Sequence, residues 1–556
     1  SPFLKVRGHH SENANYLFVD LEISESVEAG EYEITVANEK SSATFRWAVH
    51  QRTTGTRHQG FDQSDVVYLI TPDRFANGNP ENDTAEDQLN EFDPSNPSKR
   101  HGGDLAGIAE RLNYLSDLGV TTLWLNPVLE NRGVNSYHGY KTTDFYRIDP
   151  RFGSNEDYRT LVSKAHEAGL KVIFDHVSNH IGIRHRWLKD LPTKGWLNGS
   201  IENHLLDRHY LHSVSDPHAD NETRRQLKSF WFVDSMPDLN QQNEFVANYL
   251  IQNTIWWIEY SGLDGIREDT WPYTDAVFLH RWINAIENEY PNFNIVGEIW
   301  SLQSPNIARY QKGTCLPNDV PPNLNSVMDF PLSEALRRFV KGDGKLRDVH
   351  AIYAQDFLFG DPSQLMVFVD NHDMARIQFI AKGKQDRVKV ALGIMLLGRG
   401  IPQLLYGTEI GMVGGESHVE LRADFPGGFP NLRPELACAF TRKGRSADQQ
   451  SIHQWLSRLL QIRKENSAFS EGSMIHFAPT WHQDVYRFLR INDEQTVIVI
   501  ANGEPDSVDV LFDDIERYTK VKVLIDLESK RKFSTAKPLS IEGNSIRVFD
   551  LKKAIR

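Results

Sequence analysis

Hydrophobic and polar residues follow three successive patterns along the 556-residue chain. Between residues 16 and 36 apolar and polar residues partly alternate, as they do in half-buried β-strands. From residue 66 short apolar runs alternate with segments of helical periodicity, and after a helical segment at 450–465 strand patterns return. We therefore predict β-sandwich domains at both ends, at 1–60 and 469–556, around an α/β domain at 61–468. The N-terminal domain is short for a complete sandwich.

Eight short apolar runs in the central domain predict strands. They lie at 66–70, 121–125, 171–174, 265–267, 294–296, 326–328, 366–369 and 401–406. Helical patterns lie between most of them, for example at 104–118, 155–168, 244–260, 276–290 and 387–397. Eight strands that alternate with helices predict a closed (β/α)8 TIM barrel. A doubly wound sheet is the alternative, but it usually has fewer strands, and no Gly-rich phosphate loop follows a strand here.

The segment between the third and fourth predicted strands is too long for a single crossover. Its part at about 180–240 is polar and rich in His, Trp and Asp. We expect a loop-rich subdomain there, over the mouth of the barrel.

Composition excludes several partners. The net charge of −14 argues against nucleic acid and against an anionic membrane surface, because both favour basic proteins, and it is neutral about a sugar. No run of eighteen apolar residues predicts a membrane span. The two cysteines, Cys315 and Cys438, are expected to be free thiols, with one isolated bridge as the alternative.

The first residues, Ser1 and Pro2, match neither an initiator methionine nor a signal peptide. We therefore expect that the natural N-terminus was removed. A periplasmic or secreted location is expected, with the cytoplasm as the alternative.

Acidic and imidazole side chains follow four of the predicted strands. Active sites of such barrels lie at the carboxyl ends of the strands, so these side chains should meet at one mouth. A cluster of like charges is unfavourable because the charges repel one another, and such clusters occur mainly at functional sites. We therefore interpret this mouth as a catalytic site. The residues are Asp175, His176, Asn179 and His180 after the third strand, Arg267 and Asp269 after the fourth, Glu298 and Trp300 after the fifth, and His372 and Asp373 after the seventh.

Carboxylates in this arrangement suit glycoside hydrolysis. One carboxylate attacks the anomeric carbon and a second protonates the leaving oxygen. Arg267 should keep Asp269 ionised as the nucleophile, while Glu298 acts first as acid and then as base. Strand alternation directs Glu268 towards the helix layer, where we expect a Lys or Arg partner.

Five segments resemble conserved regions of the α-amylase superfamily, glycoside hydrolase family 13. They lie at 175–180, 236–240, 265–269, 297–300 and 368–373, and the resemblance extends from about residue 62 to the end. It implies that Asp269, Glu298 and Asp373 are the catalytic residues and that Tyr140 stacks beneath the sugar at the cleavage point. The expected substrate-binding residues are Tyr140, His138, Asp175, His180, Arg267, Trp271, Trp300, His372 and Arg376. For the histidines and for Arg376 a purely structural role is the alternative, and Tyr273, Trp231 and Phe232 are further stacking candidates.

Within this superfamily, Trp300 and the segments 236–240 and 422–428 are similar to the cyclomaltodextrinase and neopullulanase group. The similarity implies a retaining hydrolase of α-1,4-glucosidic bonds in cyclodextrins, short maltooligosaccharides or pullulan. Transglycosylation and non-catalytic sugar binding are the alternatives. Relatives dimerise through the N-terminal domain, so a homodimer is among the expected assemblies, and this chain is expected to begin partway through that domain.

The resemblance also bears on calcium. Pro272 and Tyr273 stand where typical α-amylases have a Lys-His pair, so the family's central calcium site is expected to be absent. A structural Ca²⁺ is expected instead at the loop 77–83, where side-chain oxygens are concentrated. A plain Asn/Gly turn is the alternative. The expected ligands are Asn77, Asn79, Asn82, Asp83, Gly102 and Asp104.

Overall fold

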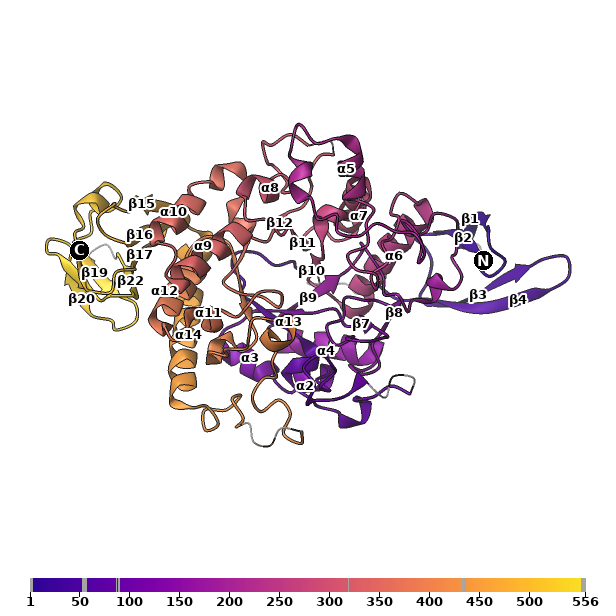
Figure 1. Cartoon of the computed structure of the whole chain (residues 1–556), viewed down its shortest axis with the longest axis horizontal. Coiled ribbons are helices and arrows are strands. Elements are labelled where there is room, and N and C mark those ends of the chain that lie inside the picture. Colours follow the sequence, from indigo (N-terminus) through magenta and orange to yellow (C-terminus); the bar gives the residue numbers. More distant parts are fainter. Residues whose placement is uncertain are drawn as a thin grey trace.

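Eight parallel strands form the centre of the structure (Figure 1). The computed structural model describes residues 4–52, 58–86, 88, 91–318, 320–432, 434 and 437–551. The strands are β5 (Val67–Ile70), β6 (Thr122–Leu125), β9 (Lys171–His176), β10 (Gly265–Glu268), β11 (Asn294–Gly297), β12 (Ser326–Val327), β13 (Met366–Phe368) and β14 (Ile401–Leu405). They pair in the order β12-β11-β10-β9-β6-β5-β14-β13. A parallel bridge between Met328 and Met366 joins the two ends of this order, so the strands close into the predicted barrel.

Helices surround the barrel, and long apolar-periodic segments of the sequence locate most of them to within a few residues. The main helices are α4 (Asn155–Glu167), α6 (Glu244–Ser261), α7 (Ala276–Glu289), α9 (Phe330–Lys341), α12 (Gln385–Leu397) and α14 (Ala447–Glu465). Shorter ones are α1 (Pro72–Phe75), α5 (Asn221–Gln226), α8 (Ser304–Ala308), α10 (Leu346–Tyr353), α11 (Ile377–Ala381), α13 (His418–Leu421) and α15 (Ala468–Glu471). Local capping fixes several boundaries. Asn243 accepts a hydrogen bond from the backbone of Phe245 at the start of α6, and Gly262 ends that helix in the left-handed conformation.

The single helix predicted at 104–118 is wrong. The structure has two short helices there, α2 (Leu105–Ala109) and α3 (Leu112–Leu118). Arg111 leaves the helical conformation between them, with φ −107° and ψ 5°. Periodicity continued across this break because both helices direct apolar residues towards the same core.

The segment after β9 is loop-rich, as expected. It contains the short 3₁₀ helices η3 (Arg186–Leu188) and η4 (Leu211–Val214), helix α5, and isolated bridges such as that between His180 and Asp238. Buried aromatic rings hold it together, among them Trp187, Trp196 and Trp231. The indole of Trp231 donates to the carbonyl oxygen of Asn198, which places this residue in the subdomain core rather than on a sugar.

The N-terminal strands form two separate antiparallel ribbons instead of the expected sandwich. One consists of β1 (Leu4–His10) and β2 (Phe18–Ile23), and the other of β3 (Gly30–Ala37) and β4 (Ser42–Val49). The ring of Phe18 lies 4.4 Å from that of Phe245 in α6, which fixes the first ribbon on the barrel. The second ribbon projects away from the body at the end opposite the C-terminal strands (Figure 1).

The C-terminal strands form the predicted sandwich-like domain. A six-stranded sheet has the order β15 (Ser473–Phe477), β16 (Val485–Ile491), β17 (Thr496–Asn502), β22 (Ser545–Asp550), β19 (Val523–Asp526) and β20 (Lys532–Ser534). A second sheet pairs β18 (Val508–Val510) with β21 (Leu539–Ile541). Ile498, Phe512 and Phe549 belong to the apolar core between them.

Candidate active site

The register of the parallel strands brings the acidic residues to one level at the barrel mouth. Arg267 in β10 lies opposite Asp175 in β9, and Glu268 lies opposite Gly297 in β11. The next residues, Asp269 and Glu298, therefore leave adjacent strands at the same height. Their backbone amides extend the ladder, with Asp269 donating to the carbonyl of His176 at 2.9 Å and Glu298 to that of Glu268 at 3.0 Å.

The guanidinium of Arg267 lies between three carboxylates. Nη1 is 2.8 Å from Asp175 Oδ1 and 2.7 Å from Asp269 Oδ1, and Nη2 is 2.7 Å from Glu298 Oε2. The sequence suggested that Arg267 served Asp269; in the structure its single positive charge is shared. Retaining glycosidases hold their two carboxyl groups about 5–5.5 Å apart, a spacing that one bridging guanidinium allows.

Burial shapes the ionisation of this cluster. Desolvation raises the pKa of Asp269; the charge of Arg267 opposes that shift, and the carboxylates of Glu298 and Asp175 add to it. Three buried carboxyl groups around one cation thus favour retention of a proton within the cluster. The arrangement can hold one ionised carboxylate and one protonated carboxyl group side by side, which is the pair that glycoside hydrolysis requires.

Asp175 positions its neighbours. Besides Arg267, its carboxylate accepts from the hydroxyl of Tyr140 at 2.8 Å and from the indole of Trp124 at 2.9 Å. With 2% exposure and both oxygens bonded by the protein, it orients the site rather than contacting the sugar. Trp124 was missed in the sequence, although it lies near the carboxyl end of the second barrel strand, where the same strand-end reasoning applies.

Tyr140 is held from several sides. Its hydroxyl accepts from Asn126 Nδ2 at 2.9 Å and lies 2.7 Å from His372 Nε2, and its ring is parallel to that of His372, 5.4 Å away. The backbone amide of Tyr140 donates to His138 Nδ1 at 3.1 Å, so the His138 proton lies on Nε2. Burial lowers the pKa of His138 well below its ordinary value, which keeps this ring a neutral donor.

Asp373 is held by two cationic or donor groups. His372 Nε2 lies 3.0 Å from Oδ2, and Arg422 Nη2 lies 2.6 Å from Oδ1. Burial opposes ionisation of Asp373, but His372 and Arg422 outweigh it and hold the pKa of this carboxyl far below its usual range. Arg422 was not among the predicted site residues; its distance in sequence from Asp373 hides the contact.

A cavity of about 650 Å³ opens beside Glu298. Trp300, 44% exposed and stacked on Phe330 at 5.0 Å, forms one side, and Phe232 meets Tyr273 edge-on at 5.0 Å on another. Exposed aromatic faces beside a carboxyl group suit the apolar faces of sugar rings. The lining residues are His209, Leu211, His212, Phe232, Thr270, Tyr273, Glu298, Trp300, Ser301, Leu302 and Gln303.

Besides Asp175, the structure moves three more predicted substrate-binding residues away from the sugar. Arg376 is fully buried, donates to the backbone carbonyls of Leu421 and Tyr406, and packs over the Tyr406 ring. Trp271 is 5% exposed and lies against the barrel strands, not in the mouth. His180 is 2% exposed, and its Nε2 lies 3.1 Å from the carbonyl oxygen of Tyr140. All three side chains are buried by neighbouring elements of the fold, and a short sequence motif does not reveal that burial.

The partner expected for Glu268 was also wrong in kind. Its carboxylate lies 2.5 Å from His176 Nδ1 and accepts from the backbone amide of Ser178 at 3.1 Å and from the Ser178 hydroxyl. It faces away from the mouth, as strand alternation predicted, but imidazole and hydroxyl groups replace the expected Lys or Arg.

The loop 77–83 gathers oxygens as predicted. Asn77 Nδ2 donates to Asp83 Oδ1 at 2.7 Å, and the carboxylate of Asp104 accepts from the backbone amides of Gly78 and Asn79. The carbonyl oxygens of the Asn77 and Asn82 side chains are buried without a hydrogen-bond partner. Gly102 lies close above this group, since a Cβ on it would lie 2.4 Å from Asp83 Oδ1. Burial raises the pKa of Asp83 to about 6.

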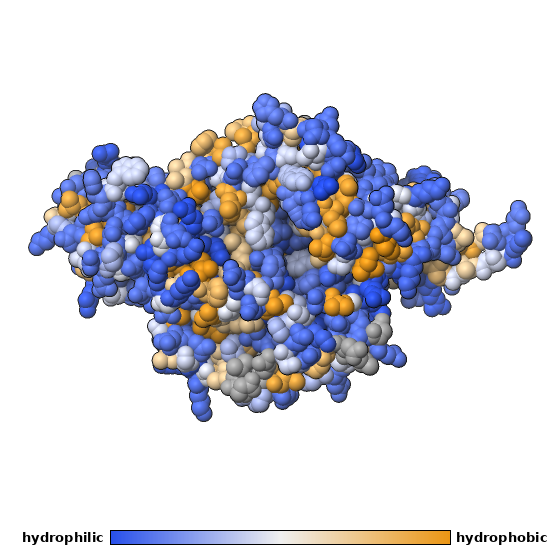
Figure 2. Space-filling view, in the orientation of Figure 1, coloured by the Kyte–Doolittle hydropathy of each residue, from blue (hydrophilic) through white to orange (hydrophobic). Residues whose placement is uncertain are grey.

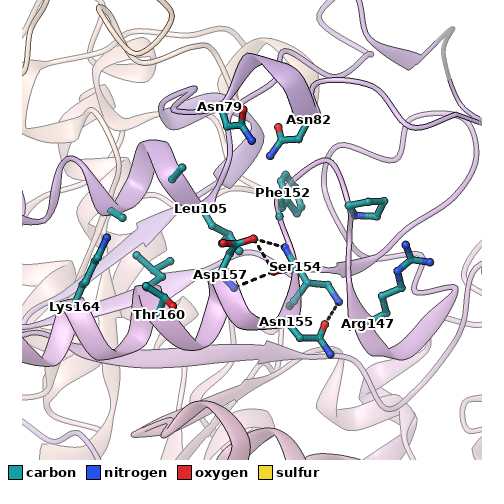
Figure 3. Close-up of a pocket in the computed structure, with 16 residues that line it drawn as sticks. Asn79, Asn82, Leu105, Arg147, Phe152, Ser154, Asn155, Asp157, Thr160 and Lys164 are labelled. Atoms are coloured by element: carbon teal, nitrogen blue, oxygen red, sulfur yellow. Dashed lines mark hydrogen bonds between the residues drawn. The ribbon is translucent and has the colours of Figure 1, made fainter.

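Asn79 does not join this group through its side chain, because its Oδ1 accepts from the backbone of Glu81 and caps the 3₁₀ helix η1 (Pro80–Asn82). Asn79 and Asn82 instead border a second cavity of about 650 Å³ (Figure 3). Ser154 and Asp157, which also line it, are joined in a capping box (Figure 3). This cavity lies outside the carboxylate cluster.

Comparison with known proteins agrees with this geometry. The family model of the α-amylase catalytic domain matches residues 69–427, and models of the cyclomaltodextrinase N-terminal and C-terminal domains match 4–53 and 474–550. A cyclomaltodextrinase of Geobacillus thermopakistaniensis is 28% identical over 450 residues, 80% of this chain and 70% of its own length. An intracellular maltogenic amylase of Bacillus subtilis is 29% identical over 505 residues, 88% of this chain and 77% of its own. A solved α-amylase of Anoxybacillus superposes with a TM-score of 0.74 at 25% identity and covers 89% of this chain and 99% of that one.

The barrel, its bridged carboxylates and the aromatic cavity define a glycoside hydrolase that acts on α-glucans. The chain belongs to the α-amylase family, whose catalytic-domain model covers most of it. Within the described residues no helix is long and apolar enough to cross a membrane.

Proposed function

We propose that this protein hydrolyses α-1,4-glucosidic bonds with retention of configuration, and that Asp269 is the nucleophile and Glu298 the acid/base. The observation that carries the proposal is the guanidinium of Arg267, which contacts Asp269 and Glu298 at 2.7 Å each. Both carboxyl groups are thereby directed at one point above the barrel.

In the first step Asp269 attacks the anomeric carbon, the bond to the leaving sugar breaks, and the leaving oxygen takes the proton of Glu298. In the second step Glu298 removes a proton from water, the water oxygen attacks the same carbon, and Asp269 leaves. These steps require Glu298 to start protonated and Asp269 to start ionised.

Asp373 would hold sugar hydroxyls next to the cleaved bond. Arg422 and His372 keep its carboxylate ionised, and hydrogen bonds from a charged acceptor are stronger than neutral ones. Tyr140 presents its ring between His138 and His372 to the apolar face of the sugar. His138 Nε2 adds a neutral donor.

The chemical roles can be separated by rescue with azide. Asp269→Asn and Glu298→Ala should each lower kcat/KM on maltotetraose by about a thousandfold or more, as loss of a catalytic group does. On α-maltosyl fluoride, whose leaving group needs little acid assistance, sodium azide should restore turnover in Glu298→Ala with an α-maltosyl azide as product, because the small anion needs no general base. The exposed Glu110→Gln serves as the control and should keep normal activity. Undiminished activity of Asp269→Asn, or a β-azide from Glu298→Ala, would contradict the assignment.

We further propose cyclodextrins and short maltooligosaccharides as the preferred glucans. Support comes from the matching cyclomaltodextrinase N- and C-terminal domains and from the relative of that name. The exposed Trp300 adds a stacking face on the acceptor side.

Initial rates on β-cyclodextrin, pullulan and soluble starch at equal glucose content test this preference. The wild type should turn over β-cyclodextrin fastest, and Trp300→Ala should raise KM for it because a stacking surface is lost. The control is Trp481→Ala, because Trp481 is also an exposed tryptophan but lies in the C-terminal domain, away from the cavity beside Glu298. Faster cleavage of starch than of β-cyclodextrin would reject the proposed preference while leaving the hydrolase assignment intact.

We also propose a structural Ca²⁺ at the loop 77–83. The unpaired oxygens of Asn77 and Asn82, the carboxylates of Asp83 and Asp104, and the backbone at Gly102 are hard oxygen ligands of the kind Ca²⁺ prefers. Such an ion would link this loop to the start of α2, which Asp104 caps.

Calcium binding should appear as a change in thermal stability. Addition of Ca²⁺ to EDTA-treated protein should raise Tm, and saturation at a hundred times Kd adds about 2.7 kcal/mol. Asp83→Asn should reduce that gain, whereas Asp509→Asn on the exposed surface of β18 should not. A wild-type Tm that is unchanged by Ca²⁺ would contradict the proposed calcium site.

We propose that the protein forms a homodimer through the projecting ribbon β3–β4. Paired residues of an antiparallel ribbon share a face, and one face contains Tyr32, Ile34, Phe45 and Trp47. Phe45 is 49% exposed, and apolar residues lie along the projecting ribbon in Figure 2. The match of residues 4–53 to the cyclomaltodextrinase N-terminal domain supports this interface, because the resemblance to that group implies a dimer through this domain.

Sedimentation velocity tests the dimer. The wild type should sediment as a dimer at micromolar concentration, and Phe45→Asp should shift it to the monomer because a charge replaces buried apolar area. Glu33→Gln on the polar face is the matched control. A monomeric wild type would contradict the proposal.

The compartment stays a prediction. The word intracellular in the name of the Bacillus subtilis relative favours the cytoplasm over the expected periplasmic or secreted location. Cys315 and Cys438 are free thiols, which agrees with a reducing compartment.

A further inference from the structure

The loop after the nucleophile strand also places the acid/base residue. Thr270 follows Asp269 in the left-handed conformation, with φ 48°, and its backbone amide donates to Glu298 Oε2 at 3.1 Å. The amide of Trp271 donates to the carbonyl oxygen of Glu298 at 3.1 Å. A non-glycine residue adopts this conformation only when its surroundings hold it there. The position of the Glu298 carboxyl group therefore depends on whatever holds residues 270–274.

A lysine from the loop-rich subdomain holds this segment. Lys228, which follows α5, places its ammonium nitrogen 2.5 Å from the carbonyl oxygen of Pro272 and 2.9 Å from that of Thr274. The charged groups around it are Asp275 at the start of α7, Asp238 in the subdomain and Arg309 after α8. Burial lowers the pKa of Lys228 to about 8, and the ammonium form still predominates at neutral pH.

A chain of polar contacts fixes the same loop from the other side. The hydroxyl of Thr274 donates to Asn179 Oδ1 at 3.3 Å. Asn179 Nδ2 in turn donates to Asp238 Oδ1 at 3.0 Å, and Asn198 donates to the other oxygen of Asp238 at 2.8 Å. The backbone at Thr274 is therefore held from two sides. Lys228 donates to its carbonyl oxygen, and the chain Asn179–Asp238 begins at its hydroxyl.

We propose that Lys228 is a positioning residue for the acid/base step: its ammonium group holds the backbone of Pro272 and Thr274, so that the preceding turn presents its amides to Glu298. The proposal rests on the proposed role of Glu298. Lys228 lies in the subdomain and Glu298 at the end of β11, so these contacts link the subdomain to the proton-donating carboxyl group.

Two substrates with different leaving groups distinguish a positioning role of Lys228 from a general structural role. Maltotetraose needs a proton from Glu298 when the bond breaks, whereas α-maltosyl fluoride leaves as fluoride and needs little acid assistance. Lys228→Met should lower kcat/KM on maltotetraose about tenfold or more, a part of the 10²–10⁴-fold that acid catalysis contributes. On α-maltosyl fluoride the loss should stay below about threefold. Lys228→Arg, which keeps the charge and the donors, should recover most of the activity.

Three further proteins complete the experiment. Lys189→Met, an exposed lysine of the same subdomain, should match the wild type on both substrates. Glu298→Gln should show the same preference for the fluoride, only larger, and a Glu298→Gln enzyme without that preference would reject the proposed function itself. If Lys228→Met does not fold, Lys228→Gln, which keeps a donor without the charge, is measured in its place.

With the Glu298→Gln preference established, two results would overturn the role of Lys228. One is a parallel loss on maltotetraose and on the fluoride, which would show a general structural effect. The other is unchanged kcat/KM on both substrates.

Discussion

The active site depends on one positive charge shared by three buried carboxyl groups. Arg267 contacts Asp175, Asp269 and Glu298 at 2.7 to 2.8 Å. A guanidinium is planar, stays charged and offers donors in several directions, so it can bridge groups that a lysine could not. Its fixed position ties the spacing of Asp269 and Glu298 to the register of β9, β10 and β11. A shift of one residue in any of these strands would turn the side chains to the helix layer.

Around this cluster the protein builds two supports that differ in kind. On one side Tyr140, His372 and Arg422 hold Asp175 and Asp373 by hydrogen bonds and ion pairs, and every partner comes from a loop at the barrel mouth. On the other side the turn after Asp269 holds Glu298 through backbone amides, and the subdomain holds that turn through Lys228. These carboxyl groups are thus placed by several neighbours that lie far apart in sequence, which limits their conformational freedom.

Strand-end reasoning located the barrel and most of the mouth because its signals are local. Eight apolar runs predicted eight strands, and alternation correctly directed Glu268 away from the mouth. The predictions that were wrong concern features that depend on packing between elements distant in sequence. His176 and Ser178 replaced the expected cationic partner of Glu268, and the helix predicted at 104–118 broke at Arg111. Within the part of the chain that the structure describes, no second sheet pairs with the ribbon β3–β4 to make a sandwich.

By itself, the sequence determined which residue types stand at each strand end, because hydrophobic periodicity and motif order are properties of short segments. It therefore predicted the barrel, the family resemblance and the three candidate catalytic carboxyl groups Asp269, Glu298 and Asp373. Only the tertiary structure decided which partner each charge has: Arg267 with three acids, Arg422 with Asp373, Arg376 with backbone carbonyls and Lys228 with the turn after the nucleophile. Buried charges must be paired, but pairing is settled by contacts between residues tens of positions apart, and no local pattern records those contacts.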